Sequence, residues 1–507
     1  MKIMKNMKIY LFLLASLFTM TSCNLDKFPD NAIDTEHAMQ SVADCENFRS
    51  GLYAGMKLCF TGSYVYGPEL QTDFYHAVLN FGGFGSALYT YSVLANESIC
   101  RSAWFGLYSY IANANFLIEG TQKLLASGTL GDADAAKVRQ YYGEACYVRA
   151  HMYYILSQYF CKDYEPVTAN EVYGIPVVLK YAPTADATKY PARGTLAATY
   201  EQILADLGEA DKYITEPGKP NSAYITTDVV TALQARVALT MHDYNTAFNK
   251  AKSLIDGGTY PLMNDARSYA EGWVNDNLTE TIWQPMMIDQ TDAGNSFSYF
   301  INNMTGVAGD DNPQFVPEDW VLRLYDRTND IRYAAYFSER NIHMPVTGRL
   351  TLMVKYPGNP KLYSGKSNYV NQPKVFRISE MYLIAAEAAA NRPGQEAVAS
   401  YYLNELKGKR IVGWYERSWS GQALTEEIQE ERVRELFGEG HRMNDIKRWH
   451  IGFARSAGQD PTLLMPGANY VSLARRADDP FFLWPIPTDE VQANPQIEQN
   501  PAYTIKN

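Results

Sequence analysis

The strongest constraint on the fold of this chain is a helical pattern between residues 226 and 257. Ala232, Ala235 and Ala238 recur every three residues in its first half, after Thr227, a residue type that caps helices. A second amphipathic segment follows and ends at two glycines, which stop helices. Because small side chains let two helix backbones approach closely, this stretch predicts a tightly packed helical hairpin.

The pattern recurs over residues 377–410, with Pro393-Gly394 as the turn between two helices. Each unit resembles a tetratricopeptide-like hairpin of about 34 residues, which buries its apolar faces only by stacking on neighbours. We therefore expect a mainly α fold, with a scaffold of tetratricopeptide-like hairpins, long irregular loops and a few short strands. Further segments with helical periodicity are residues 36–60, 104–125, 133–161, 195–215 and 424–437.

Two long stretches interrupt the helical pattern. Residues 61–100 are punctuated by glycines and rich in aromatics, and residues 259–373 combine asparagine, glycine and aspartate with aromatics. A long stretch without its own period is usually functional or disordered, and the aromatic content of residues 61–100 argues against disorder. We expect loops and short strands in the second stretch, and an extended, proline-containing tail over residues 480–507.

Composition excludes some classes of protein. The 507 residues are 46% hydrophobic and 20% charged, which is a globular balance, and the length fits two to four domains at roughly 150 residues each. The net charge of −11 argues against nucleic-acid binding, which needs clustered cations. The 38 tyrosines suit stacking on sugar rings or bases, although a tyrosine-rich helical core is the simpler interpretation.

The first residues form a targeting segment rather than part of the fold. Lys2, Lys5 and Lys8 precede an apolar run of 12 residues that is too short to span a membrane. The run ends in small residues followed by Cys23, which looks like a bacterial lipobox. We expect a lipoprotein signal peptide over residues 1–22 and a lipid on Cys23, and an ordinary secretory peptide is the alternative. No later run approaches 18 apolar residues, so the sequence predicts a lipid anchor without a membrane span.

Five cysteines follow Cys23, so not all of them can pair with each other. Cys146 and Cys161 lie in helical patterns and are interpreted as small buried hydrophobic residues. Cys45 and Cys59 would form a disulfide in an oxidising compartment, and the sequence leaves this pairing open.

A series of short motifs runs along almost the entire chain. They are Leu25-Asp26-Lys27-Phe28-Pro29, Trp104 with Tyr108, Ile111 and Asn115, Gly143-Glu144-Ala145 with Arg149-Ala150, Arg377-Ile378-Ser379-Glu380-Met381-Tyr382, Glu431-Arg432 with Glu435-Leu436-Phe437, Glu439-Gly440-His441-Arg442, Asp445 with Arg448-Trp449, and Pro485-Ile486-Pro487 with Asn494-Pro495. Their order and number resemble the SusD/RagB family of nutrient-binding outer-membrane lipoproteins of Bacteroidetes.

The resemblance carries expectations about organisation and function. It implies an N-terminal SusD-like helical region over residues 23–260 and a C-terminal RagB/SusD region over residues 261–507. It implies a lipoprotein at the surface of the outer membrane, where it covers a SusC-like TonB-dependent transporter. Proteins of the family capture oligosaccharides, or in some members peptides, and pass them to the transporter without chemistry on the ligand.

Candidate catalytic and metal-binding groups have simpler interpretations. Glu430, Glu431, Glu435 and Glu439 lie in or just after one helix among arginines, a pattern typical of ion-pair networks. The seven histidines show no HxxxH motif and no neighbouring cysteine, so we expect no zinc site and no cofactor. The run at 309–312 offers three oxygen-bearing side chains, but its spacing is not that of an EF-hand loop, and a solvated turn is the simpler interpretation.

The aromatic loops are the better candidates for a binding site. An aromatic ring offers a sugar an apolar face, while nearby carboxylates and amides exchange hydrogen bonds with its hydroxyls. The resemblance implies ligand contacts on the loop after the first helix and on loops of the middle region. The candidate substrate-binding residues are Asp73, Tyr75, Phe84, Tyr89, Tyr91 and Asn96 in the first loop, and Tyr299 and Trp320 in the middle region.

Three alternatives to oligosaccharide capture stay open at this point. The RagB side of the resemblance suggests a peptide-capturing lipoprotein. An all-α glycan-degrading enzyme would need a pair of carboxylates in a cleft and would turn its substrate over. A structural adaptor would bind only the transporter and no ligand.

Overall fold

The computed structural model describes residues 38–288, 298–301, 310–456 and 458–504 of the chain. The predicted signal peptide and lipid site at Cys23 lie outside these residues, as does Gly309 of the acidic run. The fold is mainly helical, as expected, with short two-stranded ladders between the helices. Within the described residues, no helix combines the length and the apolar composition that crossing a bilayer requires.

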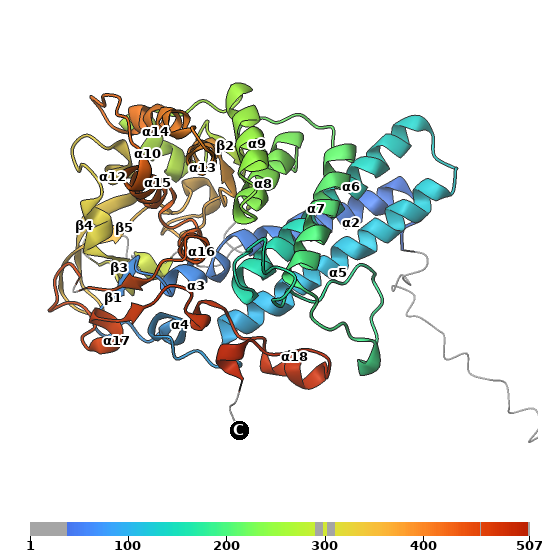
Figure 1. Cartoon of the computed structure of the whole chain (residues 1–507), viewed down its shortest axis with the longest axis horizontal. Helices are drawn as coiled ribbons and strands as arrows, with labels where there is room; N and C mark the ends of the chain where they lie inside the picture. Colours follow the sequence, from blue (N-terminus) through green and yellow to red (C-terminus); the bar gives the residue numbers. More distant parts are fainter. Residues whose placement is uncertain (1–37, 289–297, 302–309, 457, 505–507) are drawn as a thin grey trace, which may run out of the picture.

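Long helices build the N-terminal half. Two helices of 29 residues each, about 43 Å long at 1.5 Å per residue, pack along each other, with further helices against them (Figure 1). Both were expected from periodicity, whereas the short helix at residues 63–70 was not, because its glycine and proline obscure the pattern. The helices of this half are α2 (Val42–Met56), α3 (Ser63–Leu70), α4 (Ser86–Thr90), α5 (Ser98–Ala126), α6 (Asp132–Phe160) and α7 (Leu196–Tyr213).

Two helical hairpins connect the halves of the molecule, and both match the predicted units. They are α8 (Thr227–Thr240) with α9 (Tyr244–Asp256), and α13 (Ile378–Ala390) with α14 (Glu396–Arg410). Helix α9 packs against α13, so the hairpins stack on each other, and Ala251 and Ala385 are fully buried in this core. The cap of α8 is Thr226 rather than the expected Thr227, because the Thr226 side chain accepts a hydrogen bond from Val229 N.

The middle region holds short helices and several of the strands. Its helices are α10 (Ala266–Asn275), α11 (Asp319–Arg323) and α12 (Ile331–Tyr336). The strands pair antiparallel, and the longest pairing runs from Phe337 opposite Met353 to Ile342 opposite Gly348. The pairs are β1 (Tyr75–Ala77) with β3 (Phe315–Pro317), β2 (Thr281–Trp283) with β6 (Phe376–Arg377), β4 (Phe337–Ile342) with β5 (Gly348–Met353), and β7 (Phe453–Ala454) with β8 (Ala474–Arg475).

The C-terminal segment returns to the N-terminal helices (Figure 1). Arg101 on α5 forms an ion pair of 2.6 Å with Asp489, and Trp104 Nε1 donates to Glu490 at 3.3 Å. The tail was expected to be extended, but it also contains helical turns. The helices here are α15 (Gly421–Leu436), α16 (Arg442–Arg448), α17 (Ala468–Val471) and α18 (Thr488–Ala493).

Short 3₁₀ turns occur throughout the described part of the chain. They are η1 (Lys57–Phe60), η2 (Ala187–Lys189), η3 (Ser298–Phe300), η4 (Pro360–Leu362), η5 (Pro480–Phe482) and η6 (Pro501–Tyr503).

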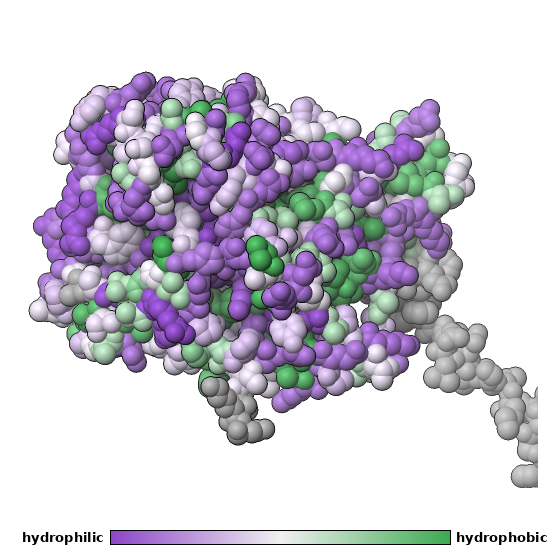
Figure 2. All heavy atoms as spheres, in the orientation of Figure 1, coloured by the Kyte–Doolittle hydropathy of each residue, from purple (hydrophilic) through white to green (hydrophobic). Residues whose placement is uncertain are grey.

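The largest hydrophobic core spans both halves of the chain. It joins side chains of α5 and α6 to those of α8, α13 and α14, and to Trp484 near the C-terminus. The five cysteines after Cys23 are buried free thiols, so Cys45 and Cys59 are not paired. The face drawn in Figure 2 is mostly hydrophilic, with hydrophobic patches scattered over it.

Candidate ligand-binding surface

Two of the predicted ligand contacts lie against each other. The rings of Phe84 and Tyr299 stack with centroids 3.5 Å apart and planes at 5°. Both side chains are partly buried, and both pack edge-on against Tyr66 of α3 at 5.7 and 5.8 Å. Residues from the first loop and from the middle region therefore form one aromatic platform, defined by Phe84, Tyr299 and Tyr66.

The backbone of a glycine-rich turn holds Phe84 on this platform. Gly82 and Gly83 both have φ of +79°, and Gly85 has φ of +63°. A Cβ at Gly85 would also lie 2.6 Å from Leu70 Cδ1. Because residues other than glycine rarely adopt this backbone conformation, the sequence Gly82-Gly83-Phe84-Gly85 fixes the position of the Phe84 ring.

A Gly83→Ala substitution tests this turn. Nothing lies within 4 Å of a Cβ at this position, so only the left-handed backbone opposes the substitution, and we expect a loss of about 1–2 kcal/mol in the free energy of unfolding. Gly51→Ala is the matched control, because Gly51 lies within α2 with equally open space and should gain about 0.4–1 kcal/mol. Chemical denaturation measures both, and equal stabilities of the two variants would contradict the role of the turn.

Four of the predicted contacts lie in the interior instead. Asp73, Tyr75, Tyr89 and Tyr91 are each at most 8% exposed. The expectation that they present side chains to a ligand is therefore corrected: the structure uses them as internal supports. Tyr75 donates its hydroxyl to Glu69 and Tyr91 donates its own to the carbonyl of Gln71, while their rings fill the core.

The cations that contact three of these residues come from the C-terminal part of the chain. Arg442 holds Asp73 with two hydrogen bonds of 2.9 and 2.8 Å. Arg455 lies 3.6 Å above the ring of Tyr89, and Arg475 lies 3.9 Å above that of Tyr91. The first loop is thus fixed by cations from a segment that is more than 350 residues away in sequence.

The remaining two predicted residues lie apart from these contacts. Asn96 is exposed just before α5. Trp320 is partly buried, donates from Nε1 to the carbonyl of Asp73 at 2.7 Å and packs against Phe74. Their role as ligand contacts stays a prediction, and Trp320 has a structural role in any case.

A buried carboxyl lies beneath the first loop. Glu69 Oε1 accepts a hydrogen bond from Gly440 N at 2.7 Å, and Tyr75 donates to its other oxygen at 3.3 Å. Burial raises the pKa of Glu69 to about 8, although the Gly440 N–H and Lys355 act in the opposite direction. The family-like motif at 439–442 therefore supports α3, the helix that carries Tyr66.

A second group of aromatics, partly buried except for Tyr415, was visible in the sequence but was not counted among the site residues. Trp414 stacks nearly parallel to Tyr415 and to Trp419, at 15° in both pairs, with centroids 6.2 and 6.4 Å apart. Tyr415 is 68% exposed, and Arg417 lies 4.9 and 4.8 Å above Trp414 and Tyr415. The signal for this group was three aromatics within six residues between two predicted helices.

The acidic groups considered as catalytic or metal-binding are engaged otherwise. Glu431 and Glu435 are fully buried and paired with arginines, as the interpretation of an ion-pair network predicted. Asp311 of the acidic run is buried and lies 3.5 Å from Arg340. Among the described residues, one group has side chains placed to share a metal ion: Asp163, Glu165 and His450.

Comparisons with known proteins agree with the motif pattern. The family model described as "SusD family" matches residues 326–503, and the model described as "Starch-binding associating with outer membrane" matches residues 25–239. A curated relative, SusD-like protein P25 of Formosa agariphila, is 29% identical over 143 residues, which are 27% of this chain and a quarter of that protein's length.

Solved structures share the fold over nearly the whole chain. A SusD superfamily protein of Bacteroides thetaiotaomicron has a TM-score of 0.76 at 25% identity, and covers 91% of this chain and 100% of its own. A protein of Bacteroides vulgatus described as a putative sugar binding protein has a TM-score of 0.75 at 24% identity, with 92% and 100% coverage. Surface glycan-binding protein A of Bacteroides fluxus has a TM-score of 0.66 at 22% identity, with 90% and 99% coverage. With two family models matching separate halves and this fold, the chain belongs to the SusD/RagB family.

Proposed function

We propose that this protein is a cell-surface lipoprotein that binds nutrient oligosaccharides and delivers them to a SusC-like TonB-dependent transporter of the outer membrane. The observation that carries the proposal is the platform of Phe84 on Tyr299, which joins two loops of a sugar-binding family at one point. The description of the N-terminal family model supports an association with the outer membrane. The lipid on Cys23 and the transporter are part of the proposal.

The platform suits a sugar for a chemical reason. The aromatic ring supplies an apolar face for the C–H groups of a pyranose, and van der Waals contact and desolvation drive the binding. Such an open contact gives moderate affinity, which a delivery protein needs because it must release its ligand. Relatives described as a sugar-binding protein and a glycan-binding protein support this ligand class over peptides.

Truncation of the platform is the direct test. Phe84→Ala and Tyr299→Ala should each weaken binding of the cognate glycan by roughly tenfold or more, since each removes one ring of the stacked pair. Tyr401→Ala is the control, because Tyr401 is 56% exposed on α14 and should leave affinity unchanged. Calorimetry and affinity gels against a panel of polysaccharides, oligosaccharides and peptide digests measure the effect.

The same experiment separates the alternatives. Saturable binding to one glycan class without product supports the proposal. Formation of product in the same tubes would favour the glycan-degrading enzyme, and binding to peptides alone would favour the RagB-like alternative. Binding to no member of the panel would contradict the proposal and favour the adaptor. Wild-type affinity in both platform variants would place the site elsewhere.

A further inference from the structure

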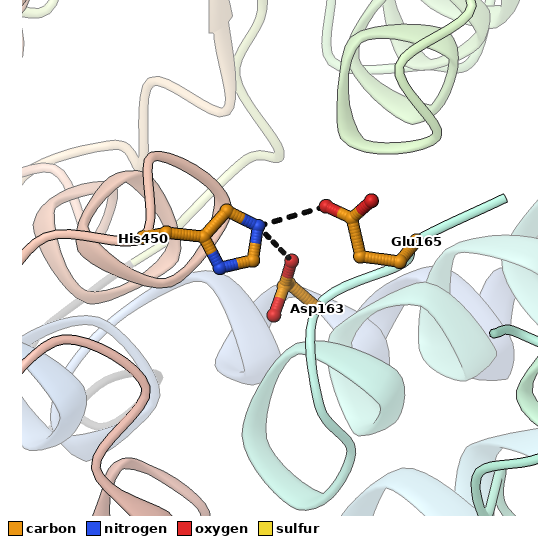
Figure 3. A group of neighbouring side chains, drawn as sticks. All are labelled: Asp163, Glu165 and His450. Atoms are coloured by element: carbon orange, nitrogen blue, oxygen red, sulfur yellow. Dashed lines mark hydrogen bonds and ion pairs between the residues drawn. The ribbon is translucent and has the colours of Figure 1, made fainter. Parts of the chain in front are cut away.

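Three potential metal ligands from distant parts of the chain meet at one point. Asp163 and Glu165 follow the end of α6, and His450 follows the end of α16, 285 residues later. His450 Nε2 lies 2.8 Å from Glu165 Oε1 and 3.4 Å from Asp163 Oδ2, and the three atoms lie within 4.8 Å of one another. Figure 3 shows the imidazole directed toward both carboxylates. Two ligands of one tetrahedral Zn²⁺ ion are about 3.3 Å apart, given bonds of about 2.0–2.1 Å.

The outer hydrogen bond of His450 prepares its inner nitrogen for a metal. Asp478 Oδ1 lies 2.7 Å from His450 Nδ1 on the side of the ring away from Glu165. A carboxylate at Nδ1 holds the proton on that nitrogen and leaves the lone pair of Nε2 directed at the site. Metal-binding histidines almost always have such a partner, which also fixes the orientation of the ring.

A second histidine adjoins the group with a similar arrangement. His242 Nε2 lies 3.5 Å from Glu165 Oε1, and His242 Nδ1 lies 2.9 Å from the hydroxyl of Tyr244. When that hydroxyl accepts the Nδ1 proton, the lone pair of Nε2 faces Glu165. His242 belongs to the turn between α8 and α9, so it adds a third segment of the chain to the group.

Ion pairing without a metal leaves two atoms of this group unsatisfied. Asp163 Oδ2 and His242 Nε2 are shielded from solvent, and neither makes a hydrogen bond. Shielded polar atoms of this kind are rare in native proteins, because each one costs about 1–3 kcal/mol of desolvation. A proton on His450 Nε2 pairs with Glu165 at 2.8 Å and only weakly with Asp163 Oδ2 at 3.4 Å, whereas a cation in the gap would contact both carboxylates directly.

The charge of the surroundings favours a cation at the same point. Three carboxylates, from Asp163, Glu165 and Asp478, face His450. Imidazole together with carboxylate oxygens is a donor set of Zn²⁺ and its neighbours in the first transition row, whereas Ca²⁺ and Mg²⁺ prefer oxygen alone.

We propose that Asp163, Glu165 and His450 bind a divalent transition-metal ion, Zn²⁺ in the first instance, with His242 beside Glu165 at the edge of the site. The ion joins the end of α6 to the end of α16, which lie far apart in sequence. Its role is structural, because it holds the N-terminal helices and the C-terminal motifs together. The site is independent of the proposed glycan platform.

Metal titration of the purified protein, carrying no polyhistidine tag, tests the site. Calorimetry with Zn²⁺ should give one ion per chain with a Kd tighter than about 10 µM, and Ca²⁺ and Mg²⁺ should bind far more weakly. Zn²⁺ should also raise the Tm, because it binds the folded chain preferentially. Co²⁺ in place of Zn²⁺ should give visible absorption bands that report histidine and carboxylate ligands.

Conservative variants locate the ion. Asp163→Asn, Glu165→Gln and His450→Ala should each weaken Zn²⁺ binding by at least tenfold, and Asp478→Asn should weaken it roughly tenfold through the orientation of His450. His343→Ala is the control, because His343 is an exposed histidine elsewhere and should leave the affinity unchanged. Absence of Zn²⁺ binding would overturn the proposal, as would binding that survives in the three ligand variants. Tm values without metal show that each variant is folded.

Discussion

Replacing Glu435 with glutamine is expected to lower the free energy of unfolding by about 3–5 kcal/mol, the range for breaking a buried ion pair from one side. The substitution keeps the shape of the side chain and removes only its charge. The loss arises because three buried arginines share this carboxylate. Each guanidinium keeps at least one other carboxylate partner, but it loses the one that all three share and cannot return to water without unfolding.

The geometry around Glu435 explains the size of this effect. Its Oε1 accepts hydrogen bonds from Arg377 at 2.7 Å and Arg410 at 2.9 Å, and its Oε2 accepts from Arg332 and Arg410, both at 3.0 Å. All four side chains are at most 1% exposed. A glutamine amide would direct N–H donors at guanidinium donors in at least one of these contacts.

Glu430 provides the matched control on the same helix. Its side chain is 50% exposed and pairs with Arg434 at 3.2 Å, so Glu430→Gln should change stability by less than about 1 kcal/mol. Denaturation in guanidinium chloride, followed by circular dichroism, measures both variants. If Glu435→Gln stays within 1 kcal/mol of the Glu430→Gln control, the buried network contributes far less than its geometry indicates.

Acid should destabilise the protein steeply, with the loss of stability concentrated between about pH 5 and pH 2. Burial alone would raise the pKa of Glu439, but Arg377 and Lys355 outweigh it and lower the pKa to about 2. Arg432 and Arg448 lower the pKa of the buried Asp445 to about 2 in the same way. Each ionised carboxylate stabilises the folded state at pH values above the pKa that it has in the unfolded chain. That stabilisation is lost as the pH falls to the lower pKa that it has in the folded chain.

The expected loss is large because several such groups titrate together. A pKa lowered from 4.5 to about 2 corresponds to about 3 kcal/mol for Glu439 alone, at 1.36 kcal/mol per pH unit. The lowered pKa values of Glu380 and Glu387 act in the same direction. Glu69 acts oppositely, since its raised pKa stabilises the fold as the pH falls from about 8 toward 4.5.

Denaturant titrations at about pH 7, 5, 3.5 and 2.5, at constant ionic strength, measure this dependence. Asp445→Asn is the informative control, because it removes one titrating group and should flatten the dependence between pH 4 and pH 2 while lowering stability at pH 7. A free energy of unfolding that stays constant down to pH 3.5 would contradict the assignment of these carboxylates as charged and paired.

The network gives a physical meaning to the family-like motifs of the C-terminal half. Arg377 opens one motif, Glu431 and Glu435 belong to the next, and Glu439 belongs to the third. The structure connects the motifs through buried ion pairs, with Arg377 bridging Glu435 and Glu439. The pattern is therefore a signature of the scaffold, in which these carboxylates pair with buried arginines.

The helical scaffold was predictable because its signals are local. The alanine spacing of α8 and α13 and the turn at Pro393-Gly394 are properties of neighbouring residues, and the structure has the hairpins where they were expected. The prediction of helices failed where the local sequence signals are weak. Helix α3 contains Gly67 and Pro68 in an aromatic stretch, and its existence depends on packing against α5 and α16.

The proposed binding surface was predictable only in part. The sequence correctly marked the first loop and the middle region as rich in aromatics, but it did not show which rings face outward. Phe84 and Tyr299 reach the surface, whereas Tyr75, Tyr89 and Tyr91 have the same chemistry and lie in the core. The difference is made by arginines such as Arg455, which meet these rings only after the chain has folded.

The sequence by itself determined the helical hairpins, the membership of the SusD/RagB family and the charged motifs that hold the scaffold together, because these depend on spacing along the chain. Only the tertiary structure decided which aromatics form the platform, and only it brought Asp163 and Glu165 to His450 across 285 residues. Burial and proximity depend on long-range packing, and no spacing of residues along one segment encodes them.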